Sequence, residues 1–407
     1  MSMKLWQTNP FQEMTLGRGE GSFVWDTKGK PYLDLVSGTW CNILGYGHSR
    51  LVGAIQDQVS KLVHVGSSFP TREIGEALLK LREVLPPELN RAVFLNTGSE
   101  AVELALKMAR TATGAEGIVV IEGGYYGATI YALSLSEAGR KTMYLPQYGE
   151  IHRLPVPDCR RCPVGHSWPC EDYYCLDMMR DTVKEGEVQI AAVLYEPVMA
   201  GGGMIVPPPG YGAQLRALTS RYEIPLIAEE VTTGMGRTGR WFGFEHDNIV
   251  PDILIIGKAI GAGLPVSAVV TTGEIEARCE SVLRHVQSHQ NDPLSGRIAA
   301  TVISILQEDH LFEQAAERGA HLLEGLKIVQ SRYPSIEDVR GKGAMVGIEL
   351  TEDHADKGKV VFQRLLNAGF IVDYQHETAT FRLFPPYIIS TQEIDSFLIA
   401  FELSMKD

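Results

Sequence analysis

A lysine and a pair of carboxylates are the residues of this 407-residue chain whose types and spacing suggest chemistry. Lys258 directly follows an apolar run that ends Ile-Ile-Gly, and Glu229 and Glu230 end an earlier apolar run. A partly desolvated lysine loses proton affinity, so its amine becomes a usable nucleophile near neutral pH. A Schiff-base lysine needs this property. The structural alternative is a lysine at a strand end that pairs with an acid.

The stretch Leu226–Val270 must position these side chains. It contains two apolar runs with a Gly/Thr/Arg loop between them and a Gly-rich turn after Lys258. Such runs predict buried strands of a parallel sheet, and the carboxyl ends of those strands form the ligand-binding edge. We therefore expect the amine and the carboxylate pair at one edge of the sheet.

Two motifs in this stretch resemble one enzyme family. Asp252–Pro265 (DILIIGKAIGAGLP) resembles the lysine segment of class III pyridoxal-phosphate (PLP) aminotransferases, and Glu229–Gly239 (EEVTTGMGRTG) resembles the acidic loop before it. The resemblance implies the α/β fold type I of PLP transferases. That fold has a large domain with a mostly parallel central sheet flanked by helices, and a smaller α+β domain. We expect residues 51–296 to form the large PLP-binding domain, residues 297–407 the small domain, and residues 1–50 a segment joining the small domain.

The same resemblance implies a cofactor site around the lysine. Lys258 would form the Schiff base with PLP and then move a proton between substrate and cofactor. Glu229 stands where the family usually has Asp, so it would keep the pyridine nitrogen protonated. Val231 and Thr232 would border the cofactor, with Thr232 in place of a common Gln. The expected catalytic residues are Lys258 and Glu229.

Other expected cofactor contacts lie outside this stretch. Gly98 and Ser99 begin a predicted helix, where free N–H groups and the helix dipole favour an anion, and the resemblance implies the PLP phosphate. A plain helix cap is the structural alternative. Tyr125 would stack on the PLP ring, unless it only lines the core. Tyr126 follows it where the family usually has His. Ser288 replaces a family Thr that reaches the cofactor of the neighbouring subunit, which implies a homodimer with shared active sites.

Two residues are candidates for substrate binding. Trp40 would be a pocket wall, or else a core indole beside a turn. Arg382 resembles the family's carboxylate-binding Arg, whose planar fork holds two oxygens, and an Arg paired with a structural acid is the alternative. Gly201 stands where some members have a gating Glu, so that gate is missing. Glu196 is accordingly expected to be structural.

A cysteine-rich loop is the most distinctive segment of the chain. Leu154–Asp177 contains four of the six cysteines, namely Cys159, Cys162, Cys170 and Cys175. A Cys-x-x-Cys followed by two more cysteines raises the question of zinc. The second half lacks a tight pair, and a similar loop occurs in a subset of class III enzymes, so we expect a structural loop or oligomer contact and no metal.

Composition limits the partners and the location. A net charge of −13 argues against nucleic acid or an anionic membrane as the main partner. The first residues lack the pattern of a signal peptide, and no apolar run reaches the roughly 18 residues of a spanning helix. We therefore expect a cytoplasmic protein with reduced thiols.

The predicted function is transfer of an amino group between an amine donor and a 2-oxo acid such as 2-oxoglutarate. The donor would be an amino acid, an ω-amine or an amino sugar, and the cofactor would pass through its pyridoxamine form (PMP). The alternative is an amino-acid racemase or epimerase of the same family, which needs a second acid such as Tyr126 or a carboxylate. A PLP-binding regulator without turnover usually has a basic DNA-binding module, and no segment here is basic enough.

Overall fold

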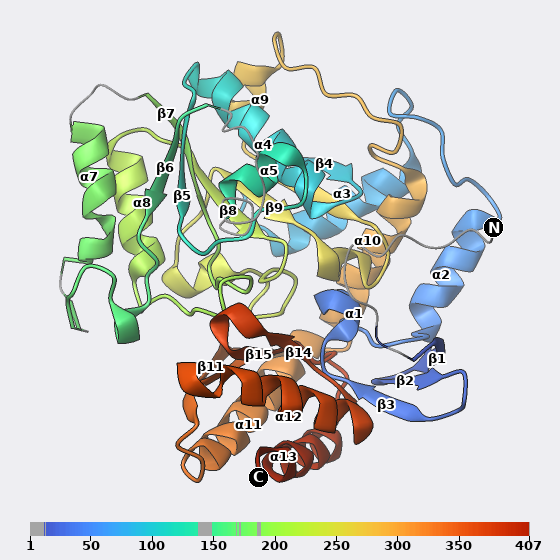
Figure 1. The fold of residues 1–407 in the computed structure, drawn as a ribbon. Helices are drawn as coiled ribbons and strands as arrows, with labels where there is room; N and C mark the ends of the chain where they lie inside the picture. The colour runs from blue at the N-terminus through green and yellow to red at the C-terminus, as the bar shows by residue number, and fades with distance from the viewer. Residues whose placement is uncertain are drawn as a thin grey trace, which may run out of the picture.

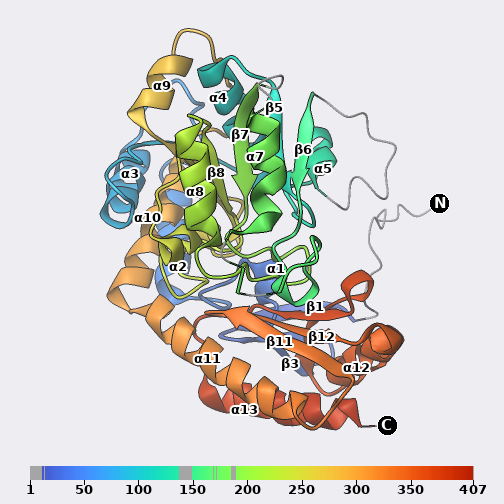
Figure 2. The same cartoon turned by 90° about the vertical axis from the view of Figure 1, so that its left-hand side faces the viewer.

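The computed structural model describes residue 12 and residues 14–136, 149–167, 169–170, 172–184 and 189–406. Figures 1 and 2 show a large part built around a central sheet, and below it a smaller part that contains the C-terminal helices. The helices are α1 (Ser37–Trp40), α2 (Ser49–Val59), α3 (Arg72–Val84), α4 (Gly98–Thr113), α5 (Ile130–Leu135), α7 (Asp177–Lys184), α8 (Tyr211–Arg221), α9 (Gly273–Cys279), α10 (Pro293–Glu308), α11 (Leu311–Gln330), α12 (Ala355–Asn367) and α13 (Thr391–Met405).

The strands form three sheets. They are β1 (Leu16–Glu20), β2 (Phe23–Asp26), β3 (Pro31–Asp34), β4 (Arg91–Leu95), β5 (Gly117–Ile121), β6 (Ile151–Leu154), β7 (Ile190–Tyr195), β8 (Leu226–Glu230), β9 (Ile253–Ile256), β10 (Ser267–Thr271), β11 (Ile336–Lys342), β12 (Met345–Leu350), β13 (Phe370–Ile371), β14 (Asp373–Gln375) and β15 (Thr380–Leu383).

The central sheet has seven strands in the order β4-β10-β9-β8-β7-β5-β6. Strand β10 is antiparallel to its neighbours β4 and β9, and the other pairs are parallel. The mostly parallel sheet expected from the sequence is thereby confirmed, as is the α/β class. Its parallel strands deliver their carboxyl ends to one edge.

Both faces of this sheet are buried, which explains why its strands read as continuous apolar runs. Ile227 and Ile255 belong to one hydrophobic core together with Leu104 of α4. Ala228 and Ile256, one residue further along, belong to a second core that includes Leu215 of α8 and Ile298 of α10. Since side chains alternate along a strand, each strand contributes to both cores, and each fully buried aliphatic side chain stabilises the fold by about 1.5–3 kcal/mol.

The smaller part consists of the antiparallel sheet β11-β12-β15-β14 and helices α11, α12 and α13. Its core includes the buried rings of Phe381, Phe397 and Phe401. The N-terminal strands β1 to β3 form a third sheet with β13 of the C-terminal region, in which β13 pairs with β3 and Leu33 lies opposite Phe370. Helix α10 packs against α2 and α3. In the described part of the chain, no helix has the length and apolarity needed to cross a bilayer.

Candidate active site

A pocket of about 400 Å³ lies at the carboxyl edge of the central sheet. Strand ends supply much of its lining, because Asn96, Tyr125, Glu196, Glu229 and Lys258 follow or end β4, β5, β7, β8 and β9. The full lining is Trp40, Cys41, Asn96, Thr97, Gly98, Ser99, Tyr125, Tyr126, Gly127, Glu196, Gly201, Glu229, Val231, Thr232, Lys258, Gly263, Leu264, Pro265 and Val266. The expected residues Trp40, Gly98, Ser99, Tyr125, Glu229, Val231, Thr232 and Lys258 are therefore brought together.

Lys258 points its amine into this pocket from a strained turn. It has φ +42°, a left-handed conformation that is costly for a residue with a side chain and that clusters at functional sites. Its Nζ donates to Thr232 Oγ1 at 2.8 Å and lies 5.0 Å from the ring centroid of Trp40. Burial lowers the pKa of Lys258, although the charge of Glu229 opposes that shift. The amine is thus held in place and becomes a free base more easily than an ordinary lysine.

The two carboxylates of β8 do not share a site. Glu229 lines the pocket, and its pKa is raised first by burial and then by the like charge of Glu196. Glu230 faces the other way and accepts hydrogen bonds from the N–H of Gly243 (2.6 Å), the N–H of Phe244 (2.8 Å) and the hydroxyl of Thr233 (2.8 Å). The expectation that both carboxylates face one edge is wrong for Glu230, because strand alternation turns it into the core.

The start of α4 forms a polar cradle at one end of the pocket. Thr97 and Glu100 form a capping box, in which Thr97 Oγ1 accepts from the Glu100 N–H at 3.2 Å. Within the described part of the chain, the N–H groups of Gly98 and Ser99 have no hydrogen-bond partner. A Cβ atom at Gly98 would lie 2.9 Å from Val231 Cγ2, so only glycine fits. Two free donors at a helix start suit a phosphate.

Tyr125 and Tyr126 have different surroundings. Tyr125 is 42% exposed and lines the pocket, and its N–H donates to Glu196 Oε1 at 2.9 Å. The hydroxyl of the buried Tyr126 instead lies 3.3 Å from the Ile121 carbonyl and accepts from the Ile121 N–H. A Cβ atom at Gly201 would lie 2.7 Å from Tyr125 Cβ, so a glutamate there would displace the ring.

Arg382 lies outside the pocket lining but contacts Trp40, which is part of it. Trp40 stacks on Phe384 with ring centroids 4.3 Å apart, and Arg382 Cζ lies 5.0 Å from the Trp40 ring. Arg382 is paired with Asp373, whose Oδ2 lies 2.8 Å from Nε and 2.7 Å from Nη2. The guanidinium is thus bound by an acid of this chain, a partner that sequence reasoning did not identify because the register of β14 and β15 creates it.

Ser288 does not join this pocket. It is exposed and lies in the loop before α10, outside the lining of the site of its own chain. Sequence reasoning also missed the lining residues Cys41 and Asn96. Asn96 follows a predicted strand, so its position could have identified it, whereas Cys41 enters through the turn of α1 and gives no such signal.

The cysteine-rich loop lies against the smaller part of the molecule. All six cysteines are free, and Cys159, Cys162, Cys170 and Cys175 surround a small hollow. Arg160 Nη1 lies 2.8 Å from Asp338 Oδ2, and Arg161 Nη2 lies 2.5 Å from Glu349 Oε1. These ion pairs connect the loop to strands β11 and β12.

Comparison with known proteins identifies the family. The family model described as "Aminotransferase class-III" matches residues 5–405. The chain belongs to the class III aminotransferases. It is 34% identical to acetylornithine aminotransferase of Methanopyrus kandleri over 95% of this chain and 92% of that protein. It is also 32% identical to leucine/methionine racemase of Thermococcus litoralis, over 96% and 90%.

A solved structure agrees with this assignment. The PLP-bound amine transaminase of an uncultivated Pseudomonas species is 27% identical, with a TM-score of 0.92 over 100% of this chain and 99% of that chain. This aminotransferase has the type I fold, and PLP is its cofactor. The polar groups of the pocket fit PLP, since an amine, an acidic side chain and the N–H groups at the start of α4 border one cavity.

Proposed function

We propose that this aminotransferase moves an amino group from an amine donor to a 2-oxo acid such as 2-oxoglutarate. The donor would be an amino acid, an ω-amine or an amino sugar. When bound, PLP supplies an aldehyde that captures the amine and a ring that accepts the electrons of the broken C–H bond. The observation that carries the proposal is the strained Lys258, whose Nζ lies 2.8 Å from Thr232 Oγ1 in the pocket with Glu229.

Lys258 is the proposed nucleophile and acid–base group. Its lowered pKa leaves a free amine that would hold the cofactor at its aldehyde carbon with loss of water, and the same amine, once released, would carry a proton. Thr232 positions the amine through its hydroxyl. Lys258 combines this left-handed backbone with a place in the cavity lining.

Glu229 is the proposed partner of the cofactor ring nitrogen. It is 5% exposed, so a positive charge beside it is poorly screened and strongly stabilised. A protonated ring nitrogen draws electrons from the reacting carbon. Gly98 and Ser99 would hold the phosphate, while Val231 and Tyr125 would pack on the ring.

Arg382 is the proposed carboxylate site, with Trp40 as the adjacent wall. An incoming carboxylate would have to compete with Asp373 for the guanidinium. That exchange replaces one charge-assisted pair by another, so the net preference for a dicarboxylate such as 2-oxoglutarate stays modest. Gly201 offers no side chain to such an exchange.

The proposed assembly is a homodimer with shared active sites. Ser288 lies outside the pocket of its own chain, and exposed apolar side chains occur at Val286 in the same loop, at Leu79 in α3, which packs against α10, and at Phe69 in the loop before α3. A second copy would cover such residues. The division into residues 1–50, 51–296 and 297–407 and the cytoplasmic location also remain proposals.

The test is a half-reaction of purified, PLP-loaded enzyme with single amine donors and no acceptor. We expect the absorbance of the bound cofactor to shift to that of PMP with at least one donor, and later addition of 2-oxoglutarate to reverse it. A panel of amino acids, ω-amines and amino sugars would identify the donor class. If no donor forms PMP, the proposal of transamination is wrong.

An amino-acid racemase or epimerase is the second candidate, favoured by the 32% identity with the leucine/methionine racemase. That reaction needs a second acid on the far face of the substrate. Tyr126 is a poor choice because its hydroxyl is bound to the backbone of Ile121. Incorporation of solvent deuterium at the α-carbon, with inversion and without PMP, would favour racemisation over transamination.

A further inference from the structure

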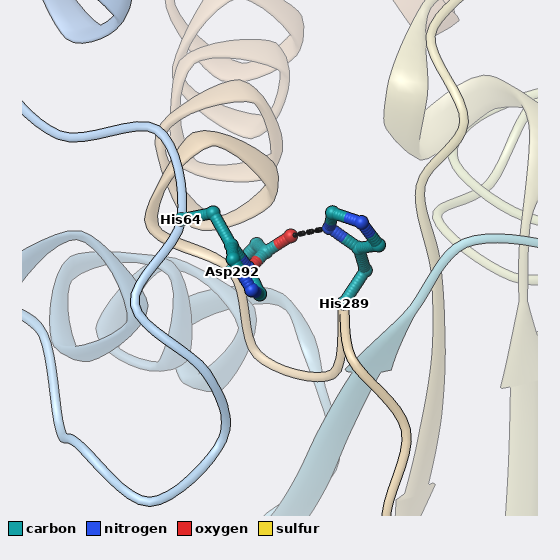
Figure 3. A group of neighbouring side chains, drawn as sticks. All are labelled: His64, His289 and Asp292. Carbon is teal, nitrogen blue, oxygen red and sulfur yellow. Dashed lines mark hydrogen bonds and ion pairs between the residues drawn. The ribbon is translucent and has the colours of Figure 1, made fainter.

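Two histidines share one aspartate beside the start of α10, away from the pocket. His64 lies in the loop after α2, His289 lies in the loop before α10, and Asp292 immediately precedes that helix (Figure 3). His64 Nδ1 is 2.5 Å from Asp292 Oδ1, and His289 Nδ1 is 2.6 Å from Asp292 Oδ2. One potential ligand atom from each residue lies within 4.8 Å of the others.

Asp292 occupies the N-cap position of α10, but its side chain does not cap the helix. An aspartate before a helix with proline in its first turn is a typical N-cap, whose carboxylate accepts a helix N–H. Here the side chain makes no capping hydrogen bond. Both oxygens are directed to the two imidazoles instead, although the residue is only 7% exposed. The carboxylate thus contacts the two histidines and leaves the helix uncapped.

We propose that His64, His289 and Asp292 form a binding site for one divalent transition-metal ion of the Zn²⁺ class. Imidazole nitrogen and carboxylate oxygen are typical zinc ligands, whereas Mg²⁺ and Ca²⁺ prefer oxygen alone. Three protein ligands leave the remaining position to water. The cluster lies outside the lining of the PLP pocket of its own chain, and all three ligands come from one chain, so metal binding can be measured separately from turnover.

Binding requires a small rearrangement that the exposure of the histidines permits. A zinc ion bonded at about 2.0–2.1 Å to nitrogen and oxygen would set these atoms roughly 3.3 Å apart, so the present N–O contacts must open. Within one chain, the side chain of His289 is 59% exposed and that of His64 is 38% exposed, so residues of the same chain do not enclose either ring.

A bound ion would connect two segments that are far apart in the sequence. The loop that contains His64 follows α2, and the turn that contains His289 also contains Ser288 and leads into α10. The ion would therefore fix the conformation of the turn beside Ser288. We expect Zn²⁺ to raise the thermal unfolding temperature of the protein, because a ligand that binds only the native state stabilises it.

The test measures metal binding to tag-free, PLP-loaded enzyme after dialysis against a chelator. Titration calorimetry with Zn²⁺ should give one site per chain, and Mg²⁺ should give no signal. His64→Gln and His289→Gln should each weaken Zn²⁺ binding by at least about 100-fold, because even the loss of a supporting partner costs 10–100-fold. His321→Gln is the matched control, since among the described residues this histidine has one carboxylate contact, at 2.7 Å from Asp395 Oδ1. The His321→Gln variant should bind Zn²⁺ with the affinity of the wild type.

Co²⁺ distinguishes this site from the cysteine-rich loop. Ligation by nitrogen and oxygen gives weak visible bands, whereas thiolate ligation adds an intense sulfur-to-metal absorption. We expect weak bands that are lost in His64→Gln and retained in Cys159→Ser. Absence of Zn²⁺ binding, equal affinity in His64→Gln and wild type, or a thiolate absorption lost in Cys159→Ser would overturn the proposal. An unchanged PLP absorbance spectrum would verify that each variant is folded.

Discussion

Glu229 and Glu230 are adjacent, identical in type and both nearly inaccessible to water, yet they belong to different regions of the molecule. Glu229 borders the pocket and increases the proton affinity of Lys258. Glu230 accepts three hydrogen bonds that fix the loop after β8 and η3 (Gly243–Asp247), and burial still raises its pKa to about 7. The comparison separates a carboxylate positioned for chemistry from one that maintains the fold.

The pair Thr232 and Thr233 repeats this division three residues later. Thr232 accepts the hydrogen bond of Lys258, and Thr233 donates to Glu230. Substitutions on the pocket side should therefore reduce activity, and substitutions on the core side should reduce stability.

The largest effect is expected for Lys258, whose amine lies in the pocket. Lys258→Ala should lower turnover by at least about 10⁴-fold, because nucleophile and acid–base group are lost together. Borohydride should no longer attach the cofactor covalently to the protein. Lys258→Arg is the control, since it retains the charge without the nucleophile and should be equally inactive. Normal turnover in either variant would refute the assigned role.

Glu229→Gln should lower turnover by about 10²–10³-fold, similar to the loss of one preorganised electrostatic contact in other enzymes. The melting temperature should stay near that of the wild type, because Gln fills the same space. Glu229→Asp keeps the charge and should recover most of the activity. Equal turnover in the Gln variant and the wild type would exclude Glu229 as the partner of the ring nitrogen.

The same variant has a predicted pH dependence. The negative charge of Glu229 raises the pKa of Lys258, so its removal should lower that pKa further. Since the free amine is the reactive form, the rate at which apoenzyme recombines with PLP should reach its plateau at lower pH in Glu229→Gln. A shift to higher pH would contradict the electrostatic coupling.

Glu230→Gln should produce the opposite phenotype. A glutamine has only one acceptor oxygen, so its amide N–H groups would face either the N–H of Phe244 or the donors of Gly243 and Thr233. Mispaired buried polar groups cost about 1–3 kcal/mol, which denaturant unfolding would measure. Turnover of the folded fraction should remain close to wild type. A catalytic loss as large as that of Glu229→Gln would remove the distinction between the two acids.

Arg382, the proposed carboxylate site beside Trp40, extends the comparison to substrate binding. Arg382→Ala should raise the KM for 2-oxo acids by about 10–100-fold, because a charge-assisted pair is worth roughly 1.5–3 kcal/mol. Asp373→Asn should instead lower this KM about 5-fold, since it removes the competing charge. If neither variant changes KM while both lower stability, the Arg382–Asp373 pair is structural only.

The smallest effects are expected for the two threonines. Thr232→Val removes the hydroxyl that positions Lys258 and should lower turnover about 5-fold, equivalent to roughly 1 kcal/mol. Thr233→Val should lower the free energy of unfolding by a similar amount and leave turnover unchanged. Kinetics and denaturant unfolding of both variants check this contrast between lost turnover and lost stability. Identical phenotypes would contradict it.

The sequence by itself determined the family, the α/β class with its mostly parallel sheet, and the residues that meet at its edge. Lys258 and Glu229 follow apolar runs, and Gly98 and Ser99 begin a helix after another run, so local patterns contain this information. Continuous apolar runs mark strands buried on both faces, and parallel strands bring their carboxyl ends to one edge.

Only the tertiary structure decided which neighbours serve which task. Strand alternation relative to the two cores directs Glu229 to the pocket and Glu230 to the core, and the register of β14 with β15 pairs Asp373 with Arg382. The same holds for His64 and His289, which are 225 residues apart and share a carboxylate that the sequence presents as a helix cap. Contacts of this kind depend on long-range packing, for which no local sequence pattern exists.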